Sequence, residues 1–155
     1  ETVFKEIGAV IARGFSFVGP HFPLDTHFAI GNFISASLRK EPIVVTGDGG
    51  DLRSYMYGSD LASWLWTILV KGEPGIAYNV GSDRGLSINS LAQLVARTLE
   101  NPADIRILNG DNLSQRRYYV PNIQKARGLG LELKIDLESA IVKTAQWATK
   151  HPAIA

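Results

Sequence analysis

The chain of 155 residues contains no cysteine. This absence excludes disulfide bonds, thiolate metal sites and cysteine nucleophiles. An excess of charge is also missing: the formal net charge is +1 at pH 7, which gives no electrostatic argument for nucleic acid or an acidic membrane surface as a partner. The longest apolar run has only about the length of one buried strand, so the sequence predicts no membrane-spanning helix. The three histidines, His21, His27 and His151, lack the spacing of a metal site.

The start of the chain lacks two further features. It has no initiating methionine, since the only Met is Met56, and its first six residues show no signal-peptide pattern. A segment of a longer reading frame and a processed start both account for the missing methionine. Without cysteine or a signal we expect a cytoplasmic location. Hydrophobic residues make up 45% and charged residues 20%, which predicts one globular domain over residues 1–155.

Apolar stretches with the spacing of strands and of helices alternate along the chain. Residues 3–18 are almost continuously apolar and end at Gly19-Pro20, which is typical of a strand buried on both faces of a parallel sheet. Residues 109–119 form a polar stretch that we expect to be a loop. Alternating strands and helices predict an α/β fold. We expect strands at residues 43–46, 53–57, 76–80 and 105–108, and helices at 26–39, 60–71, 88–100, 121–127 and 137–150.

Arg53 follows a glycine-rich turn, residues 47–50, and opens a short aromatic strand. An arginine beside flexible backbone can make paired hydrogen bonds to a phosphate group. The alternative is an ordinary structural arginine at the start of a strand. Ser59 and Ser87 have the side chain and the place expected of helix N-caps. Asp60 suits the first turn of the helix after Ser59, because its charge is favourable there.

Three other segments carry candidate binding residues. The loop from Arg13 to Pro20 follows the first strand, and ligands of open α/β sheets bind beyond the carboxyl ends of strands. Asn32 lies near the start of a helix, where an amide donor adds to a site that already favours anions. Arg116 and Arg117 form a basic pair in the polar loop. The alternatives are a tight turn, a solvent-facing polar residue and a solvated arginine pair. His27 is expected in a loop or as a cap rather than as a catalyst.

These segments together resemble the extended short-chain dehydrogenases/reductases that act on nucleotide sugars, the NAD-dependent epimerases and dehydratases. The resemblance covers residues 7–150 in the family's order. Residues 13–20 resemble the pattern Arg-x-x-Asn-x-Tyr-Gly-Pro, with Ser16 in the place of Asn. Residues 28–34 resemble the Ser-Asn-Phe-Ile helix start of UDP-glucuronate decarboxylases. Residues 116–130 resemble Arg-x-x-x-Pro-Asp-x-x-Lys-Ala-x-x-x-Leu-Gly-Trp. The pattern Gly-x-Gly-x-x-x-Arg-x-(aromatic)-x-Tyr-Val-x-Asp is matched in register by Gly47, Gly49, Arg53, Tyr55, Tyr57 and Asp60.

The resemblance implies that this chain binds the nucleotide diphosphate of a nucleotide sugar. It also implies that Phe15 contacts NAD. No catalytic residue is expected here, because the chain has neither the Gly-x-x-Gly-x-x-Gly fingerprint nor a Tyr-x-x-x-Lys pair. The residues that the resemblance assigns to the substrate are Arg53, Asn32, Arg116, Arg117 and Ser16.

We therefore expect the C-terminal, substrate-binding part of a longer Rossmann-like enzyme whose N-terminal half holds most of the NAD. Such enzymes oxidise the sugar transiently at C4 and serve the biosynthesis of surface-polysaccharide sugars, and the whole protein is expected to be a homodimer. The alternative is a stand-alone nucleotide-sugar binding or regulatory module without chemistry. A third possibility is an interaction domain that keeps only the fold, which would show no Arg53-dependent binding of UDP or dTDP.

The purified 155-residue chain is expected to show no NAD-dependent turnover of nucleotide sugars, because it lacks the dinucleotide fingerprint and the Tyr/Lys pair. Following NADH absorbance and product formation with UDP- and dTDP-sugars measures this. Epimerase or dehydratase activity in the purified chain would overturn the expectation that this is one part of an enzyme.

Overall fold

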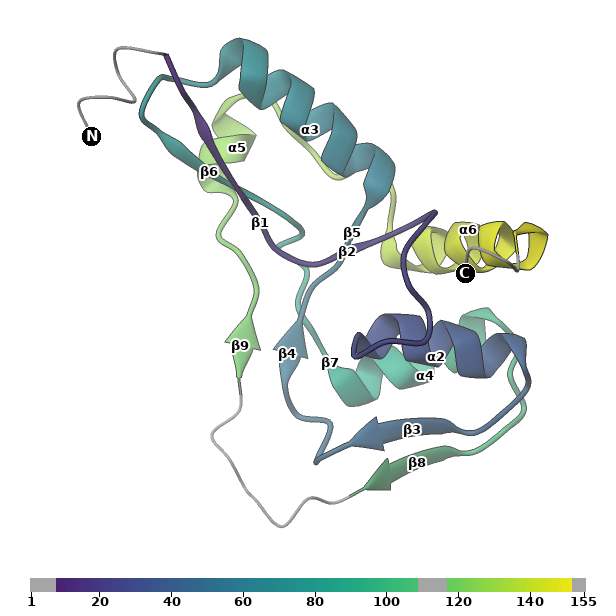
Figure 1. Ribbon diagram of the computed structural model, residues 1–155. Helices are drawn as coiled ribbons and strands as arrows, with labels where there is room; N and C mark the ends of the chain where they lie inside the picture. The colour runs from purple at the N-terminus through teal and green to yellow at the C-terminus, as the bar shows by residue number, and fades with distance from the viewer. Residues whose placement is uncertain (1–7, 109–116, 152–155) are drawn as a thin grey trace.

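The computed structural model describes residues 8–108 and 117–151 of the chain. Strands and helices alternate in it, which confirms the predicted α/β fold (Figure 1). In chain order the elements are β1 (Ile11–Gly14), β2 (Phe17–Val18), α2 (Ala29–Leu38), β3 (Ile43–Thr46), β4 (Leu52–Arg53), β5 (Met56–Tyr57), α3 (Gly58–Lys71), β6 (Ala77–Val80), β7 (Leu86–Ser87), α4 (Ile88–Thr98), β8 (Ile105–Leu108), β9 (Tyr118–Tyr119), α5 (Gln124–Gly128) and α6 (Leu137–Lys150).

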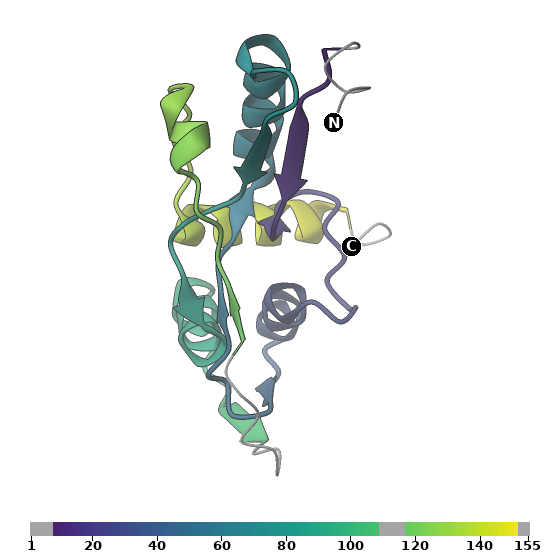
Figure 2. The ribbon, with the colours of Figure 1, turned by 90° about the vertical axis from the view of Figure 1, so that its left-hand side faces the viewer.

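The described strands form several small sheets. β1 pairs with β6, β2 with β5 and β3 with β8, in each case in parallel. β4 lies between β7, which is antiparallel to it, and β9, which is parallel to it. Figures 1 and 2 show β1 and β6 beside α3 at one end of the molecule, and β3 and β8 at the other end. The strands β4, β7 and β9 connect the two ends.

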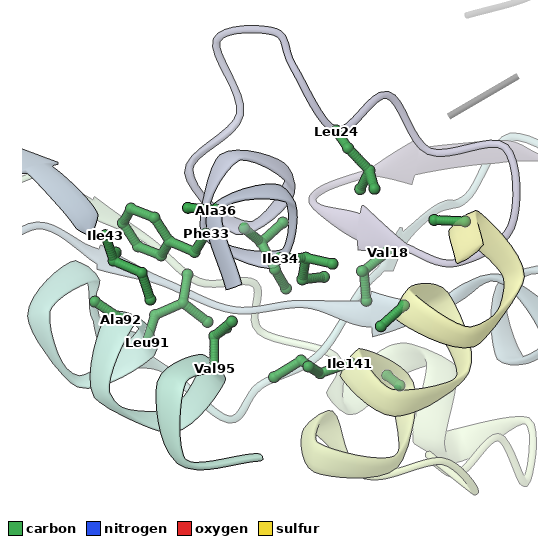
Figure 3. Packing of buried hydrophobic residues seen from close by; sticks show 14 of the residues in the cluster. Val18, Leu24, Phe33, Ile34, Ala36, Ile43, Leu91, Ala92, Val95 and Ile141 are labelled. Carbon is green, nitrogen blue, oxygen red and sulfur yellow. The ribbon is translucent and has the colours of Figure 1, made fainter. Parts of the chain in front are cut away.

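Each end has its own hydrophobic cluster. In the smaller cluster, Trp64 of α3 packs with Val80 of β6, and both are buried. The larger cluster joins α2, α4 and α6, and Figure 3 shows Ile34, Leu91 and Ile141 meeting there. All three have 0% exposure. Burying a side chain of this size contributes about 1.5–3 kcal/mol, so these contacts fix how α2 sits relative to α4 and α6.

Several predicted elements are confirmed. β3, β8 and α6 have the bounds that the sequence predicts. The predicted cap at Ser87 is also present, because its side chain accepts a hydrogen bond from the backbone N–H of Ser90 at 3.0 Å. α4 ends at Thr98, two residues earlier than predicted. These elements are the ones with a clear apolar period and a capping residue in the sequence.

The prediction of one long buried strand before Gly19 is wrong. β1 and β2 are separate strands, and all four residues of β1 are exposed. The chain changes its pairing partner between them: the N–H of Phe15 donates to the carbonyl of Val80, and the carbonyl of Ser16 accepts from the N–H of Met56. β1 is exposed because, among the described strands, it has a neighbour on one edge only.

The predicted helix from residue 26 begins later, at Ala29, with Phe28 as its N-cap. The sequence spacing predicts Phe28, Phe33, Ile34 and Leu38 on the inner side of this helix. Phe33 and Ile34 are buried, which confirms half of that prediction, but Phe28 is 43% exposed and Leu38 is 38% exposed. Both misplaced residues lie at the helix ends, where the amphipathic period no longer determines which side faces the core.

Two other local predictions need correction. The strand predicted at residues 53–57 is divided into β4 and β5, because β4 pairs with β7 and β9 whereas β5 pairs with β2. Ser59 does not cap α3, since the helix begins at Gly58 with Tyr57 as its N-cap. Asp60 lies in the first turn of α3, as predicted.

The segment before the last helix also differs from the prediction. Tyr118 and Tyr119 form β9 and are not loop, because they pair with β4. Residues 109–116 of the predicted loop lie outside the described residues. α5 begins at Gln124 and not at Pro121, and the side chain of Asn122 accepts from the N–H of Gln124 at 3.0 Å. Pro121 lies three residues before the first residue of the helix and does not open it.

Asp60 is a buried structural carboxylate. Its side chain is only 3% exposed. Its Oδ2 atom accepts hydrogen bonds from the backbone N–H groups of Lys134 at 2.9 Å and Ile135 at 3.1 Å. Asp60 therefore joins the start of α3 to the segment that leads into α6.

Replacing Asp60 by Ala leaves these two partly buried N–H groups without their acceptor. An unpaired buried donor costs about 1–3 kcal/mol, so Asp60→Ala is expected to lower the free energy of unfolding by about 1–2 kcal/mol. Urea unfolding followed by circular dichroism measures the change. The matched variant Asp60→Asn keeps an oxygen acceptor and is expected to lose less. Equal stability of Asp60→Ala and the unchanged chain would contradict this role.

Candidate functional site

A cavity of about 410 Å³ lies where the carboxyl end of β1, the start of α2 and the segment after β4 meet. It brings together three residues that the sequence singles out: Phe15, Ser16 and Arg53. Aromatic rings make up much of its wall. Its lining residues are Phe15, Ser16, Phe17, Phe22, His27, Phe28, Ala29, Arg53, Tyr55 and Ile88.

Phe15 and Ser16 reach the cavity because the chain crosses from one strand pair to the next at these two residues. Both backbones are hydrogen-bonded, Phe15 to Val80 and Ser16 to Met56, each at 3.0 Å. Gly81 follows β6 and allows Phe15 to approach, since a Cβ atom at Gly81 would lie 3.0 Å from the Cβ of Phe15. The expected position beyond the carboxyl end of a parallel strand is therefore confirmed for Phe15 and Ser16.

The guanidinium of Arg53 is held on one side and open on the other. Its Nη1 donates to the carbonyl of Leu52 at 2.9 Å and to the carbonyl of Arg117 at 3.4 Å. Its Nη2 donates to Oδ2 of Asp51 at 3.3 Å. Nε has no partner among the described residues, and the side chain is 24% exposed. The planar guanidinium of Arg53 is therefore held in one orientation, and it still has an N–H group that can donate to a ligand in the cavity.

Tyr119 lies beside this guanidinium. The Cζ atom of Arg53 is 5.9 Å from the centre of the Tyr119 ring, which is within range of a cation–π contact. The same ring lies 4.8 Å from the ring of Phe15. Tyr119 reaches this place because β9 runs parallel to β4 with Arg53 and Tyr119 in register. Tyr119 was not predicted as a site residue, because no local pattern in the sequence indicates that the polar loop ends in a strand.

Tyr55 contributes a neutral phenol to the cavity. Burial raises the pKa of Tyr55 to about 12, against the opposing effect of the positive charge on Arg53. The hydroxyl of Tyr55 therefore keeps its proton at neutral pH and can act as a hydrogen-bond donor. This role was not anticipated, since the sequence shows Tyr55 only as part of an aromatic strand.

The N-terminus of α2 also faces this region, because Phe28 and Ala29 line the cavity. No side chain caps this helix, and its first turn holds no acidic residue. An uncapped helix start offers backbone N–H groups and a partial positive charge. His27 lies in the loop before α2 with its ring 4.3 Å from that of Phe28, and it lines the cavity. The predicted loop position of His27 is confirmed, and its place in the cavity wall is new.

Arg117 lies at a second cavity of about 320 Å³. Ala29 and Ile88 line both cavities, so the two adjoin. The backbone N–H of Arg117 donates to Oδ1 of Asp51 at 2.9 Å. Asp51 therefore accepts hydrogen bonds from both Arg53 and Arg117. In the sequence, only its place two residues before Arg53 pointed to such a role.

Two candidates do not join this arrangement. Asn32 lies in the first turn of α2 but is exposed and lines neither cavity. Arg116 lies outside the described residues.

In the described ranges 8–108 and 117–151, no three His, Asp or Glu side chains are grouped as metal ligands. No helix within those ranges has the length and apolar character needed to cross a bilayer.

Comparison with known proteins assigns the family. A family model described as the NAD dependent epimerase/dehydratase family matches residues 4–81, which is half of the chain. This chain belongs to that family. The matched part includes Phe15, Ser16, Arg53 and Tyr55 of the cavity.

Individual relatives agree with this assignment. The chain is 30% identical over 146 residues to a trifunctional UDP-glucose 4,6-dehydratase/UDP-4-keto-6-deoxy-D-glucose 3,5-epimerase/UDP-4-keto-L-rhamnose-reductase of Arabidopsis thaliana, covering 92% of this chain and 21% of that protein. It is 35% identical over 134 residues to UDP-glucuronic acid decarboxylase 2 of the same plant, covering 84% of this chain and 29% of the relative.

The fold is shared with solved structures. The UDP-glucose 4-epimerase of Thermotoga maritima, solved with UDP-glucose, superposes with a TM-score of 0.81 at 24% identity. The match covers 92% of this chain and 46% of that one. This confirms the Rossmann-like α/β architecture of the family. The chain therefore spans between 21% and 46% of the length of these three proteins.

Gly49 shapes the turn that leads to Asp51 and Arg53, so its substitution tests the local architecture. Its φ is 68°, and an added Cβ would lie 3.1 Å from side-chain atoms of both Val45 and Asn89. Gly49→Ala is expected to lower the free energy of unfolding by about 1–3 kcal/mol, because alanine resists this backbone conformation. The control is Gly128→Ala, whose Cβ would meet no heavy atom within 4 Å. Equal effects of both variants in urea unfolding would contradict this.

Proposed function

We propose that this chain is the nucleotide-sugar binding part of an NAD-dependent nucleoside-diphosphate-sugar epimerase or 4,6-dehydratase. The observation that carries the proposal is the single cavity in which Arg53, the uncapped start of α2 and a wall of aromatic rings meet. A nucleotide sugar combines an anionic diphosphate with flat or weakly polar groups on either side. The cavity provides cationic and N–H groups for the first and ring surfaces for the second.

The diphosphate is the part of the substrate that this geometry recognises most strongly. Charge-assisted hydrogen bonds from a guanidinium to phosphate oxygens are stronger than neutral ones. Arg53 is pre-oriented by Leu52 and Asp51, so little side-chain freedom is lost when a phosphate binds. The N-terminus of α2 is a second group at the cavity that favours negative charge. Ser16, Tyr55 and His27 contribute further polar groups to this cavity.

Binding of the diphosphate, which does not itself react, would position the sugar for its reaction. Interactions with a non-reacting part of the substrate hold the reacting atoms in place and so lower the barrier. In this proposal the sugar passes through a transient 4-keto form, and the products serve surface-polysaccharide biosynthesis. Because the named relatives carry out dehydration, epimerisation and decarboxylation of UDP-sugars, we propose UDP-sugars as the first substrates to test.

NAD supplies reversible hydride transfer in this family. From this chain we assign Phe15 to the cofactor, because it lies beyond the carboxyl end of β1 and presents its ring to the cavity. We propose that most of the dinucleotide binds to an N-terminal half of the whole enzyme, and that the whole enzyme is a homodimer. A binding module without chemistry would need the same cavity.

Replacing Arg53 by Ala is expected to weaken UDP-sugar binding by about 1.5–3 kcal/mol, the contribution of hydrogen bonds to a charged group. This corresponds to roughly a 10- to 150-fold higher dissociation constant. Isothermal titration calorimetry with UDP-glucose, UDP and dTDP measures it.

The matched control is Arg97→Ala. Arg97 is paired with Glu138 at 2.8 Å on an exposed surface and lines neither of the two cavities described above. Its replacement should leave the affinity unchanged. Equal affinities for the unchanged chain and Arg53→Ala would remove Arg53 from the site. No binding of any of these ligands would instead favour an interaction domain that keeps only the fold.

A further inference from the structure

Asp51 makes contacts that an ordinary turn residue does not need. It follows the glycine turn directly and precedes β4. Its Oδ2 accepts from Nη2 of Arg53 at 3.3 Å, and its Oδ1 accepts from the backbone N–H of Arg117 at 2.9 Å. Its own carbonyl accepts from the N–H of Ile88, the first residue of α4, at 3.0 Å. One residue thus connects the arginine of the cavity, the segment entering β9 and the start of α4.

These connections join the walls of both cavities. Arg53 lines the first cavity, Asp51 and Arg117 line the second, and Ile88 lines both. The backbone N–H of Leu52 also donates to the carbonyl of Arg117 at 2.9 Å, so this strand pairing begins directly beside Asp51. A change at Asp51 would therefore alter the direction of the guanidinium and the distance between the two arginine-bearing segments.

The carboxylate has an electrostatic cost at a site for anions. A negative charge next to a bound diphosphate is repulsive. A residue that served only to attract the substrate would not be acidic. The contacts of Asp51 show what its charge does instead: it orients Arg53 and ties down the backbone of Arg117, and Arg53 keeps Nε without a partner among the described residues.

We propose that Asp51 is a positioning residue of the diphosphate site, acting through Arg53 and through the backbone of Arg117. This inference rests on the proposed function, since it assumes that a nucleoside diphosphate binds at Arg53. Asp51 does not touch the substrate in this proposal. It sets the direction from which Arg53 donates.

Two substitutions test these contacts of Asp51. Asp51→Ala removes both acceptors and is expected to weaken UDP binding about tenfold. Asp51→Asn removes the repulsive charge but keeps only one of the two oxygen acceptors, so its affinity is expected to lie between those of Asp51→Ala and the unchanged chain. The affinity of Asp51→Asn should also fall more steeply with added salt, because the site gains one unit of positive charge.

A double-mutant cycle with Arg53→Ala tests whether Asp51 acts through that arginine. In the Arg53→Ala background, Asp51→Ala is expected to cause less than a threefold further loss of UDP affinity, because the group that it positions is absent. Calorimetry with UDP measures binding, and circular dichroism establishes that each variant is folded. Asp83→Asn is the matched control, since Asp83 pairs with Arg127 at 2.8 Å and lines neither cavity, so its UDP affinity should stay unchanged.

Failure of this inference differs from failure of the proposed function. If UDP binding depends on Arg53 but Asp51→Ala binds normally, Asp51 is not a positioning residue. Independent, multiplicative losses from the two alanine variants would likewise overturn the action through Arg53. If Asp51→Ala is unfolded, UDP binding by folded Asp51→Asn that is as tight as that of the unchanged chain would also overturn it. If neither the unchanged chain nor any variant binds UDP, the proposed function itself fails.

Discussion

The structure of the cavity depends on how the guanidinium of Arg53 is held. Two carbonyl groups and one carboxylate fix Arg53 from one side, and the ring of Tyr119 lies near it. The carbonyl of Arg117 and the ring of Tyr119 are in place because β4 pairs in parallel with β9, which brings together residues more than sixty positions apart in the chain. The central three-stranded sheet is small, but it connects the two hydrophobic clusters and carries the most important charge of the cavity.

The two clusters have different roles around this sheet. The larger one fixes α2 against α4 and α6, so the uncapped start of α2 points at the cavity. The smaller one fixes α3 against β6, and thereby the strand end that carries Phe15 and Ser16. The two clusters thus pack the elements that carry the cavity. Its polar groups are few and its aromatic surface is large, which is the usual composition of a small-molecule site.

Membership of the NAD-dependent epimerase/dehydratase family agrees with this arrangement. Relatives of this chain are named for dehydration, epimerisation or decarboxylation of nucleotide sugars. These reactions differ at the sugar and share the nucleoside diphosphate. In the function proposed above, the cavity recognises this shared group through an oriented arginine and a helix start, and such a site would suit all of these reactions. The residues of the cavity therefore indicate the nucleoside diphosphate and not the product.

The sequence by itself determined the α/β class, the family and three residues of the cavity. β3, β8 and α6 and the cap at Ser87 were predicted correctly because their apolar periods and capping residues are local signals. The spacing of the glycine turn and Arg53 was likewise a local pattern. Only the tertiary structure decided that the chain changes partners between Phe15 and Ser16, that Tyr119 and Asp51 surround Arg53, and that Asn32 stays outside. These outcomes depend on pairings between distant segments and on the direction of side chains at helix ends, and neither leaves a periodic trace in the sequence.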